Sequence, residues 1–362
     1  LAGVVAAAGV ALRSGGWSGV RGFSLVTATR VTALDRAART VTLSCGEALG
    51  YDRLVLATGS DPVRLPLPGA DRPEVATFRD MADVARMEAL EPGARAVVIG
   101  GGLLGIEAAW GLKRRGVDVT LVHVLDRLME RQLDGAAASE LKKAIEARGI
   151  RVLLDSTSER VDSTSPPTLI LNRKMRSDVG ETLTRPVSLP FDLLVMAVGI
   201  RPRVTLGKDA GLAVGRGILV DDRMTTSDPA IHAIGECCEH AGLVAGLVEP
   251  AYAQALVLAR TFVGEPAAYR ATAVATNLKV SGVPVFSCGR HETEAGDEEI
   301  RVVDPELGLY RKLLVREGRL VGCVLVGDTA DGLFYLDLVA SGRPVAAIRS
   351  SLAFGRAHCE AA

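Results

Sequence analysis

Hydrophobic and polar positions along the chain predict strands and helices in turn. Apolar runs in DRLVLATGS and FDLLVMAVGIRP are typical of central parallel strands, whereas MADVARMEAL and PAYAQALVLARTFVG repeat apolar positions every three or four residues, as amphipathic helices do. Residues 23–60 predict short strands with polar turns, 156–190 a small antiparallel meander, and LKKAIEAR at 141–148 a helix. The stretch 274–354 alternates like a small α+β unit. The pattern therefore predicts an α/β protein.

The most regular part of the pattern reads AVVIGGGLLGIEAAWGLKRRGVDVTLVH and ends at His123. A buried strand, a glycine-rich turn, a helix and a second strand follow one another, which is the βαβ arrangement of dinucleotide sites. Its first glycine permits the tight turn, the second lets backbone approach a pyrophosphate, and the third lets helix and strand pack closely. An ordinary glycine-rich turn is the alternative. The residues expected to contact the nucleotide are Gly100, Gly102, Leu103, Leu104 and Gly105.

Selectivity for one nicotinamide nucleotide is left open by the sequence. An NAD site usually places an acid at the end of the second strand, but that position is His123. Arg127 is close enough in sequence to meet a 2′-phosphate, although a solvated surface arginine is the alternative. Glu107, expected in the first turn of the helix, either complements the helix dipole or hydrogen-bonds the nicotinamide carboxamide.

Apolar strands that turn sharply at glycine occur on both sides of the βαβ unit. One is ATGS, with Ala57, Thr58 and Gly59, and the other is IHAIGECCEH, with Gly235 and Glu236. An acid at such a strand end can accept a hydrogen bond from a ribityl hydroxyl. The two segments bracket the βαβ unit as an interrupted domain would. The strand FDLLVMAVGIRP ends similarly, at Gly199, a further candidate nucleotide contact.

Composition narrows the class of protein. The 362 residues suffice for two or three domains, and 48% hydrophobic with 4% aromatic residues predicts cores of Ala, Val, Leu and Ile. A net charge of −1 gives no basic field for nucleic acid. The longest apolar run, LAGVVAAAGVAL, is about half the ~20 residues that span a bilayer, and it lacks the charged region of a signal peptide. We therefore expect a soluble, cytoplasmic protein without nucleic-acid or membrane partners.

The six cysteines form no C-x-x-C pair and no Cys/His group with zinc spacing, so no metal site is predicted. Cys237 and Cys238 are adjacent, which is poor geometry for a disulfide. We interpret the cysteines as small buried residues in a reducing compartment.

These motifs together resemble the two-dinucleotide flavoprotein reductases, the pyridine nucleotide–disulfide oxidoreductase class. The second flavin segment of that class matches here at Thr226, Ile231, Ala233, Gly235 and Glu236. Within the class, RLMERQLD, IGECCEH, ATNLKVSGVPVFSCG and LVGDTADGLFYLDLVASG are most similar to the flavoprotein part of NAD(P)H-dependent nitrite reductase large subunits.

The resemblance implies two Rossmann-like, three-layer ββα domains, the first incomplete, followed by a small C-terminal α+β domain. Residues 1–92 correspond to the back half of the first FAD segment, 93–200 to the inserted NAD(P) domain, 201–265 to the second FAD segment, and 266–362 to the interface domain. The chain has a single GxGxxG, so the FAD fingerprint of the class is expected to be missing. Glu249, before the helix that faces the flavin in the class, departs from the expected small or apolar residue.

The function implied is an NAD(P)H:FAD module that passes electrons to an iron–sulfur, rubredoxin-like or siroheme partner, as in assimilatory nitrite reductase. Without clustered cysteines the chain cannot reduce nitrite by itself. Glu107 is the expected catalytic residue. A rubredoxin or ferredoxin reductase, or a nucleotide-binding remnant without FAD, are the alternatives, and a homodimer is left open.

Overall fold

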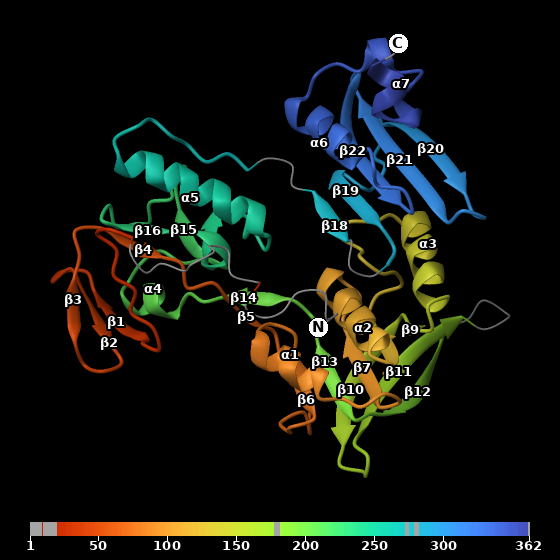
Figure 1. Cartoon of the computed structure of the whole chain (residues 1–362), viewed down its shortest axis with the longest axis horizontal. Helices are drawn as coiled ribbons and strands as arrows, with labels where there is room; N and C mark the ends of the chain where they lie inside the picture. Colours follow the sequence, from red (N-terminus) through yellow and green to blue (C-terminus); the bar gives the residue numbers. More distant parts are fainter. Residues whose placement is uncertain (1–8, 10–19, 177–181, 272–274, 279–281, 361–362) are drawn as a thin grey trace. The chain divides into compact units, whose positions relative to one another are not determined.

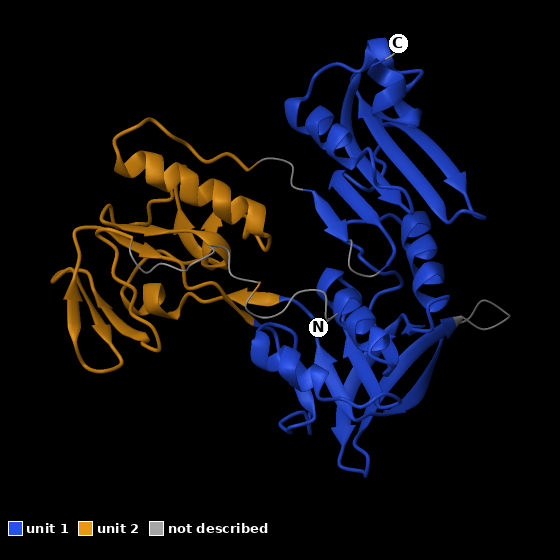
Figure 2. Ribbon diagram, in the orientation of Figure 1, with its two compact units in different colours: residues 1–2, 62–199, 272–362 blue, residues 3–61, 200–271 orange. Residues whose placement is uncertain are grey.

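The computed structural model describes residues 9, 20–176, 182–271, 275–278 and 282–360, and it divides into two compact units. Unit 2 combines residues 3–61 with 200–271, and the remaining residues form unit 1 (Figure 2). The chain thus leaves unit 2 after residue 61 and returns to it at residue 200. Residues 62–199 of unit 1 therefore interrupt unit 2 along the chain. The four domain ranges predicted from the sequence stay predictions.

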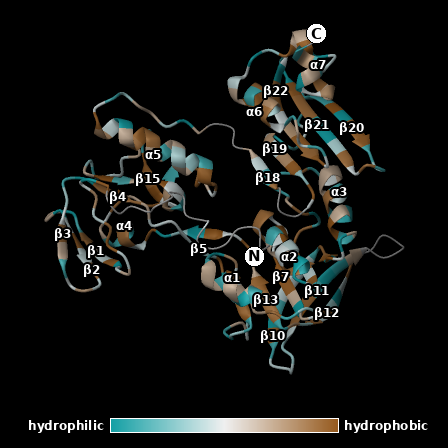
Figure 3. Cartoon of the chain, in the orientation of Figure 1, coloured by the Kyte–Doolittle hydropathy of each residue, from teal (hydrophilic) through white to brown (hydrophobic). Residues whose placement is uncertain are grey.

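Unit 1 is built on a parallel sheet of five strands in the order β6-β13-β7-β8-β9. The central strand β7 is apolar after its first residue, as a strand covered on both faces must be (Figure 3). The strands are β6 (Val75–Thr77), β7 (Arg95–Ile99), β8 (Asp118–Val122), β9 (Arg151–Leu153) and β13 (Leu193–Met196).

Three helices of unit 1 accompany the parallel sheet: α1 (Met81–Glu88), α2 (Leu103–Arg114) and α3 (Gly135–Glu146) (Figure 1). The predicted helix 141–148 begins earlier, at Gly135, because the carboxylate of Asp134 accepts a hydrogen bond from the amide of Ala137 and caps it. Asp80 caps α1 in the same way.

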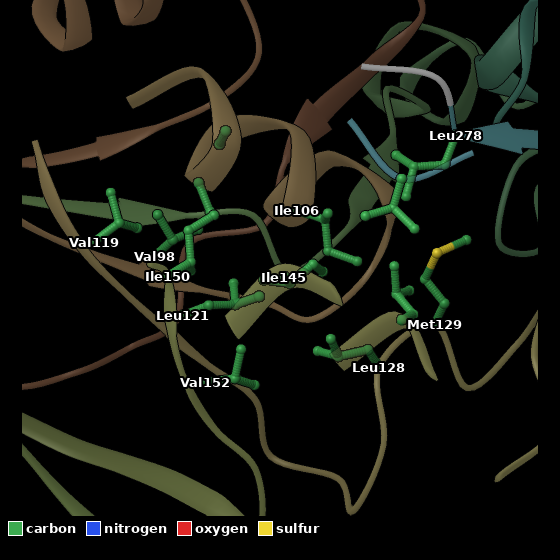
Figure 4. Packing of buried hydrophobic residues seen from close by; sticks show 14 of the residues in the cluster. Val98, Ile106, Val119, Leu121, Leu128, Met129, Ile145, Ile150, Val152 and Leu278 are labelled. Atoms are coloured by element: carbon green, nitrogen blue, oxygen red, sulfur yellow. The ribbon is translucent and has the colours of Figure 1, made fainter. Parts of the chain in front are cut away.

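Different elements pack against the two faces of the parallel sheet. Ala96 and Val98 of β7 pack with the helices, in a core that Figure 4 shows with Ile106 of α2 and Ile145 of α3. Val97, on the other face, packs instead against the antiparallel meander. The meander consists of β10 (Ser156–Asp162), β11 (Thr168–Arg176) and β12 (Thr182–Pro190). Meander, sheet and helices are the three layers that were predicted.

The C-terminal part of unit 1 is an antiparallel sheet in the order β18-β19-β22-β21-β20. One face packs on α6 (Gly332–Ser341). The other face contributes Tyr310, Val324 and Val326 to the core between the parallel sheet and its helices, where β21 and β22 contact α3. The C-terminal sheet and the βαβ unit therefore share a core. Its strands are β18 (Thr276–Leu278), β19 (Val285–Gly289), β20 (Glu298–Asp304), β21 (Leu309–Arg316) and β22 (Arg319–Val326), and α7 (Arg356–Glu360) follows.

Unit 2 contains a second antiparallel meander followed by short parallel pairs. Strand β4 (Leu54–Leu56) pairs in parallel with β16 (Ile231–Ala233), although 174 residues separate their ends. The helix α5 (Val248–Phe262) follows (Figure 1). The other elements are β1 (Val31–Asp35), β2 (Thr40–Leu43), β3 (Ala48–Gly50), β5 (Ser60–Pro62), β14 (Ile200–Pro202), α4 (Thr205–Asp209), β15 (Ile218–Val220) and β17 (Cys238–His240).

Among the described residues, no helix combines the length and apolar character needed to cross a membrane. Within the same ranges, no three or more His, Cys, Asp or Glu side chains gather in a group that could hold a metal ion.

Candidate functional site

The glycine-rich turn between β7 and α2 is held by close backbone contacts. Gly100 has φ +124°, and a Cβ there would stand well under 3.0 Å from the carbonyl oxygen of Ala197, just after β13. A Cβ on Gly105 would overlap the carbonyl oxygen of Gly100. The packing of the chain itself therefore requires the first and third glycines of the motif.

Gly102 differs from its neighbours because the chain's own packing does not require it. Its backbone is extended, with φ −82° and ψ −175°, and a Cβ there would meet no described atom within 4 Å. It provides no side-chain cap for α2, whose first turn carries no acidic residue. Leu103 and Leu104 open the helix, half-buried and exposed respectively. Open space above unoccupied helix N–H groups fits a pyrophosphate.

His123, directly after β8, is hydrogen-bonded to this turn. It is 8% exposed, and its Nδ1 accepts a hydrogen bond of 3.0 Å from the amide of Gly101. Its Nε2 lies 3.2 Å from Oε2 of Glu130. Because Nδ1 is an acceptor, a neutral ring carries its proton on Nε2 and donates it to Glu130. Both ring nitrogens are thus engaged within the protein.

The segment RLMERQLD, residues 127–134, connects the glycine turn to the C-terminal sheet within unit 1. The amide of Met129 donates to the carbonyl of Gly101 over 2.9 Å. In the other direction, Arg127 pairs with Glu292 over 2.7 Å, and Nε2 of His291 lies 3.2 Å from the carbonyl oxygen of Glu130. Arg127, predicted either to meet a phosphate or to be solvated, is thus held in an ion pair.

Asp134, at the end of this segment, belongs to a buried polar network. Its Oδ2 accepts from Nζ of Lys312 and from the hydroxyl of Tyr310, each over 2.7 Å. Burial opposes the charge of Asp134, but these hydrogen bonds and that from the Ala137 amide hold its pKa below the ordinary value. Burial and the neighbouring carboxylate raise the pKa of Tyr310. The network anchors the C-terminal sheet to the start of α3.

Glu107 lies further along α2 than was expected. The helix begins at Leu103, so Glu107 is past the first turn, which corrects the predicted position and weighs against the dipole interpretation. Burial raises its pKa. Among the described residues its carboxylate has no hydrogen-bond or ion-pair partner. A half-buried acceptor without a partner is suited to a ligand donor such as a carboxamide.

Gly199 follows β13, the strand beside β7, at the carboxyl edge of the parallel sheet. Its φ is +113°, no described atom lies within 4 Å of the position of a Cβ, and its carbonyl accepts from the amide of Val63 over 2.9 Å. It therefore stands at the sheet edge where ligands of open α/β sheets bind.

In unit 2, the pairing of β4 with β16 brings the two flavin-type segments together. The hydroxyl of Ser60 donates to Oε2 of Glu236 over 2.6 Å, and Thr58 donates to the carbonyl of Arg203 over 2.9 Å. Gly235 has φ +76° and donates its amide to Gln254. Ala57 is exposed and Gly59 half-buried in the same turn. An acid held at this strand end fits a ribityl hydroxyl.

The adjacent cysteines beside this acid are not reactive groups. Cys237 and Cys238 are both buried and unbridged. Burial and the neighbouring Cys237 raise the pKa of Cys238 to about 12, so its thiol stays protonated near neutral pH.

Residues 11–255, more than half of the chain, match the family model of pyridine nucleotide-disulphide oxidoreductases. The chain belongs to this family. Residues 275–343 of this chain match a second model, the rubredoxin NAD+ reductase C-terminal domain.

Two relatives from Bacillus subtilis (strain 168) are a nitrite reductase [NAD(P)H], 41% identical over 89% of this chain and 39% of its own length, and an assimilatory nitrate reductase electron transfer subunit, 36% identical over 95% and 43%. The chain spans about two fifths of the length of these curated relatives. Among solved structures, NADH:rubredoxin oxidoreductase from Clostridium acetobutylicum has a TM-score of 0.71 and 25% identity, over 95% of this chain and 84% of that one.

The putidaredoxin reductase–putidaredoxin complex gives a TM-score of 0.82 at 24% identity, over 95% of this chain and 82% of that one, which shows the shared fold. The two-dinucleotide fold class predicted from the sequence is confirmed.

Three residues that contact the predicted site residues were not singled out from the sequence. Ser60 holds Glu236, Glu130 holds His123, and Glu292 holds Arg127. Ser60 and Glu130 lie inside the quoted motifs ATGS and RLMERQLD, so a local signal existed for both. Glu292 is 165 residues from its partner, and no pattern in the sequence connects the two.

Proposed function

We propose that this chain is an electron-input module that takes a hydride from NAD(P)H and passes electrons through FAD to a separate redox centre. The observation that carries the proposal is the open space at Gly102, beside the free N–H groups at the N-terminus of α2. The chain's own packing leaves this space, here called the cradle, unfilled. Free N–H groups there would hold the pyrophosphate of a nicotinamide nucleotide.

The side chains of unit 1 would orient the rest of that nucleotide. Glu107, half-buried and without a partner among the described residues, would accept a hydrogen bond from the nicotinamide carboxamide. Its position along α2 separates the acceptor from the phosphate cradle at the beginning of the helix. A half-buried acceptor without a partner among the described residues favours a ligand that donates a hydrogen bond, because burying a polar group without one costs free energy.

For FAD, the residues of unit 2 supply part of a site. Glu236, held by Ser60, would accept from a ribityl hydroxyl, and the turn at Gly59 lies at the end of the neighbouring strand. FAD, when bound, accepts hydride and releases electrons one at a time. Cys237 and Cys238 are buried and unbridged, and the raised pKa of Cys238 keeps its thiol protonated, so the pair offers no dithiol route and the electrons are proposed to leave to a partner.

The proposed partner is an iron–sulfur, rubredoxin-like or siroheme centre of nitrite or nitrate assimilation, in line with the names of the Bacillus subtilis relatives. A rubredoxin reductase is the second candidate, which the match of residues 275–343 to a rubredoxin NAD+ reductase C-terminal domain favours. Six cysteines without a disulfide among the described residues are consistent with a cytoplasmic location.

The test starts from purified chain with added FAD. We expect flavin absorbance to be retained after desalting, and NADH or NADPH to bleach it under anaerobic conditions. Reoxidation by rubredoxin, but not by a nitrite reductase siroheme domain, would select the second candidate. Light scattering on the same sample measures whether it is a homodimer.

Gly102→Ala is the matched variant for this test. The backbone of Gly102 is allowed for alanine and its Cβ would meet no described atom, so the variant should fold with little change in stability but fill the cradle. We expect it to lose nucleotide affinity. Unchanged affinity for both nucleotides would refute the cradle, and nucleotide binding without any flavin retention would indicate a nucleotide-binding remnant.

A further inference from the structure

The ion pair between Arg127 and Glu292 lies where a nucleotide site distinguishes its two common ligands. In βαβ sites, the end of the second strand holds the adenosine ribose, through an acid for a 2′-hydroxyl or an arginine for a 2′-phosphate. The second strand here is β8, and residue 127 lies in the turn that follows it.

Contacts of the neighbouring residues place this turn directly beside the glycine loop. A Cβ on Gly101 would stand well under 3.0 Å from both the ring of His123 and a methyl group of Leu128. The amide of Met129 donates to the carbonyl of Gly101. Arg127 is therefore flanked on both sides by residues that contact the loop.

Among the polar residues of the turn, Arg127 is the one placed to distinguish a 2′-phosphate from a 2′-hydroxyl. His123 is buried, with both ring nitrogens engaged, and Glu130 is its partner. Asp126 and Arg131 are exposed. The cations of residues 123–134 are Arg127 and Arg131, and Arg127 is the one beside the residues that touch Gly101.

Glu292 determines what Arg127 is available to bind. Nη2 of Arg127 lies 2.7 Å from Oε1 of Glu292, which belongs to the C-terminal part of unit 1. The neighbouring His291 contacts the carbonyl of Glu130, which fixes this loop against the segment 127–134. The guanidinium is thus directed toward the C-terminal sheet, and its charge is neutralised there. Its Nε is buried and has no partner among the described residues, so the group keeps a spare donor.

We propose that Glu292 is a positioning residue for nucleotide selectivity, because it holds Arg127 in an ion pair and so withholds it from a 2′-phosphate. The chain then binds NADH in preference to NADPH. The inference rests on the proposed function, since it concerns the same nucleotide site. It also means that selectivity is set jointly by two parts of the chain that are far apart in sequence.

Titration calorimetry of the full chain with NAD+ and with NADP+ tests the proposal. Glu292→Gln removes the charge but keeps the shape of a side chain that is half exposed. A released arginine that makes a charge-assisted bond should raise NADP+ affinity by about tenfold. Affinity for NAD+ should stay the same, because NAD+ lacks the phosphate. Glu292→Asp should keep the original preference.

Two further variants separate selectivity from a general change in structure. Arg127→Ala added to Glu292→Gln should abolish the gain in NADP+ affinity, whereas Arg131→Ala added to it should leave the gain intact. A gain that survives the loss of Arg127, or no gain at all, overturns the inference while nucleotide binding by the parent chain stands. Failure of the parent chain to bind either nucleotide overturns the proposed function instead.

Discussion

Replacing Lys312 with methionine should strongly destabilise unit 1. The substitution keeps the length of the side chain but removes the ammonium group that lies 2.7 Å from the carboxylate of Asp134. The two side chains are only 3% and 7% exposed, so Asp134 would be left charged and buried without a counter-ion. Removing one partner of a buried pair costs about 3–5 kcal/mol. The hydroxyl of Tyr310 and the Ala137 amide still bond Asp134, so we expect the free energy of unfolding to fall by about 3 kcal/mol.

A matched control is the pair Lys142–Glu146 on α3, which has the same 2.7 Å separation but side chains that are 32% and 39% exposed. Lys142→Met should cost about 0.3–0.5 kcal/mol, the value of an exposed helical pair. Urea unfolding can be followed through the fluorescence of Trp110 in unit 1, with the other tryptophan, Trp17, replaced by phenylalanine. Equal losses for the two methionine variants would refute the argument that burial gives the network its strength.

The pH dependence of this effect has a definite sign. The pKa of Asp134 is depressed in the folded chain, so its contribution is present above the unfolded pKa of about 4 and is lost as pH falls through the folded pKa. The difference between the parent chain and Lys312→Met should therefore be full at pH 7 and shrink in acid. A difference that grows below pH 4 would contradict the assignment.

Three further predictions concern the candidate sites. Gly105→Ala places a Cβ against the carbonyl of Gly100 and should destabilise unit 1 by about 1–3 kcal/mol in urea unfolding, unlike an alanine at Gly102. Because burial raises the pKa of Glu107, the parent chain should lose stability relative to Glu107→Gln as pH rises from the unfolded toward the folded pKa; parallel pH profiles would contradict this. Ser60→Ala removes a donor to Glu236 and should weaken FAD binding about tenfold by fluorescence titration, with no change in NAD+ affinity.

Much of the fold could be predicted because its signals are local. The strand, turn and helix around Gly100 and Gly105 follow from apolar periodicity and from backbone positions that accept only glycine. The three layers around the parallel sheet were expected from the resemblance to the flavoprotein reductases, whose motifs are local in the sequence as well. The start of α3 was predicted too late, because the cap is a single aspartate, Asp134, whose role depends on the conformation around it.

The sequence by itself determined the glycine-rich turn and the interruption of one unit by the other, since the first depends on residues close together in the chain and the second on family motifs on both sides of that turn. Only the tertiary structure decided that His123 is engaged inside the protein, that Glu292 holds Arg127, and that Lys312 neutralises Asp134. The physical reason is that the spacing of charged residues along the chain does not indicate which residues they pair with. An arginine and a glutamate 165 residues apart become a pair only when a shared hydrophobic core brings their strands and turns together.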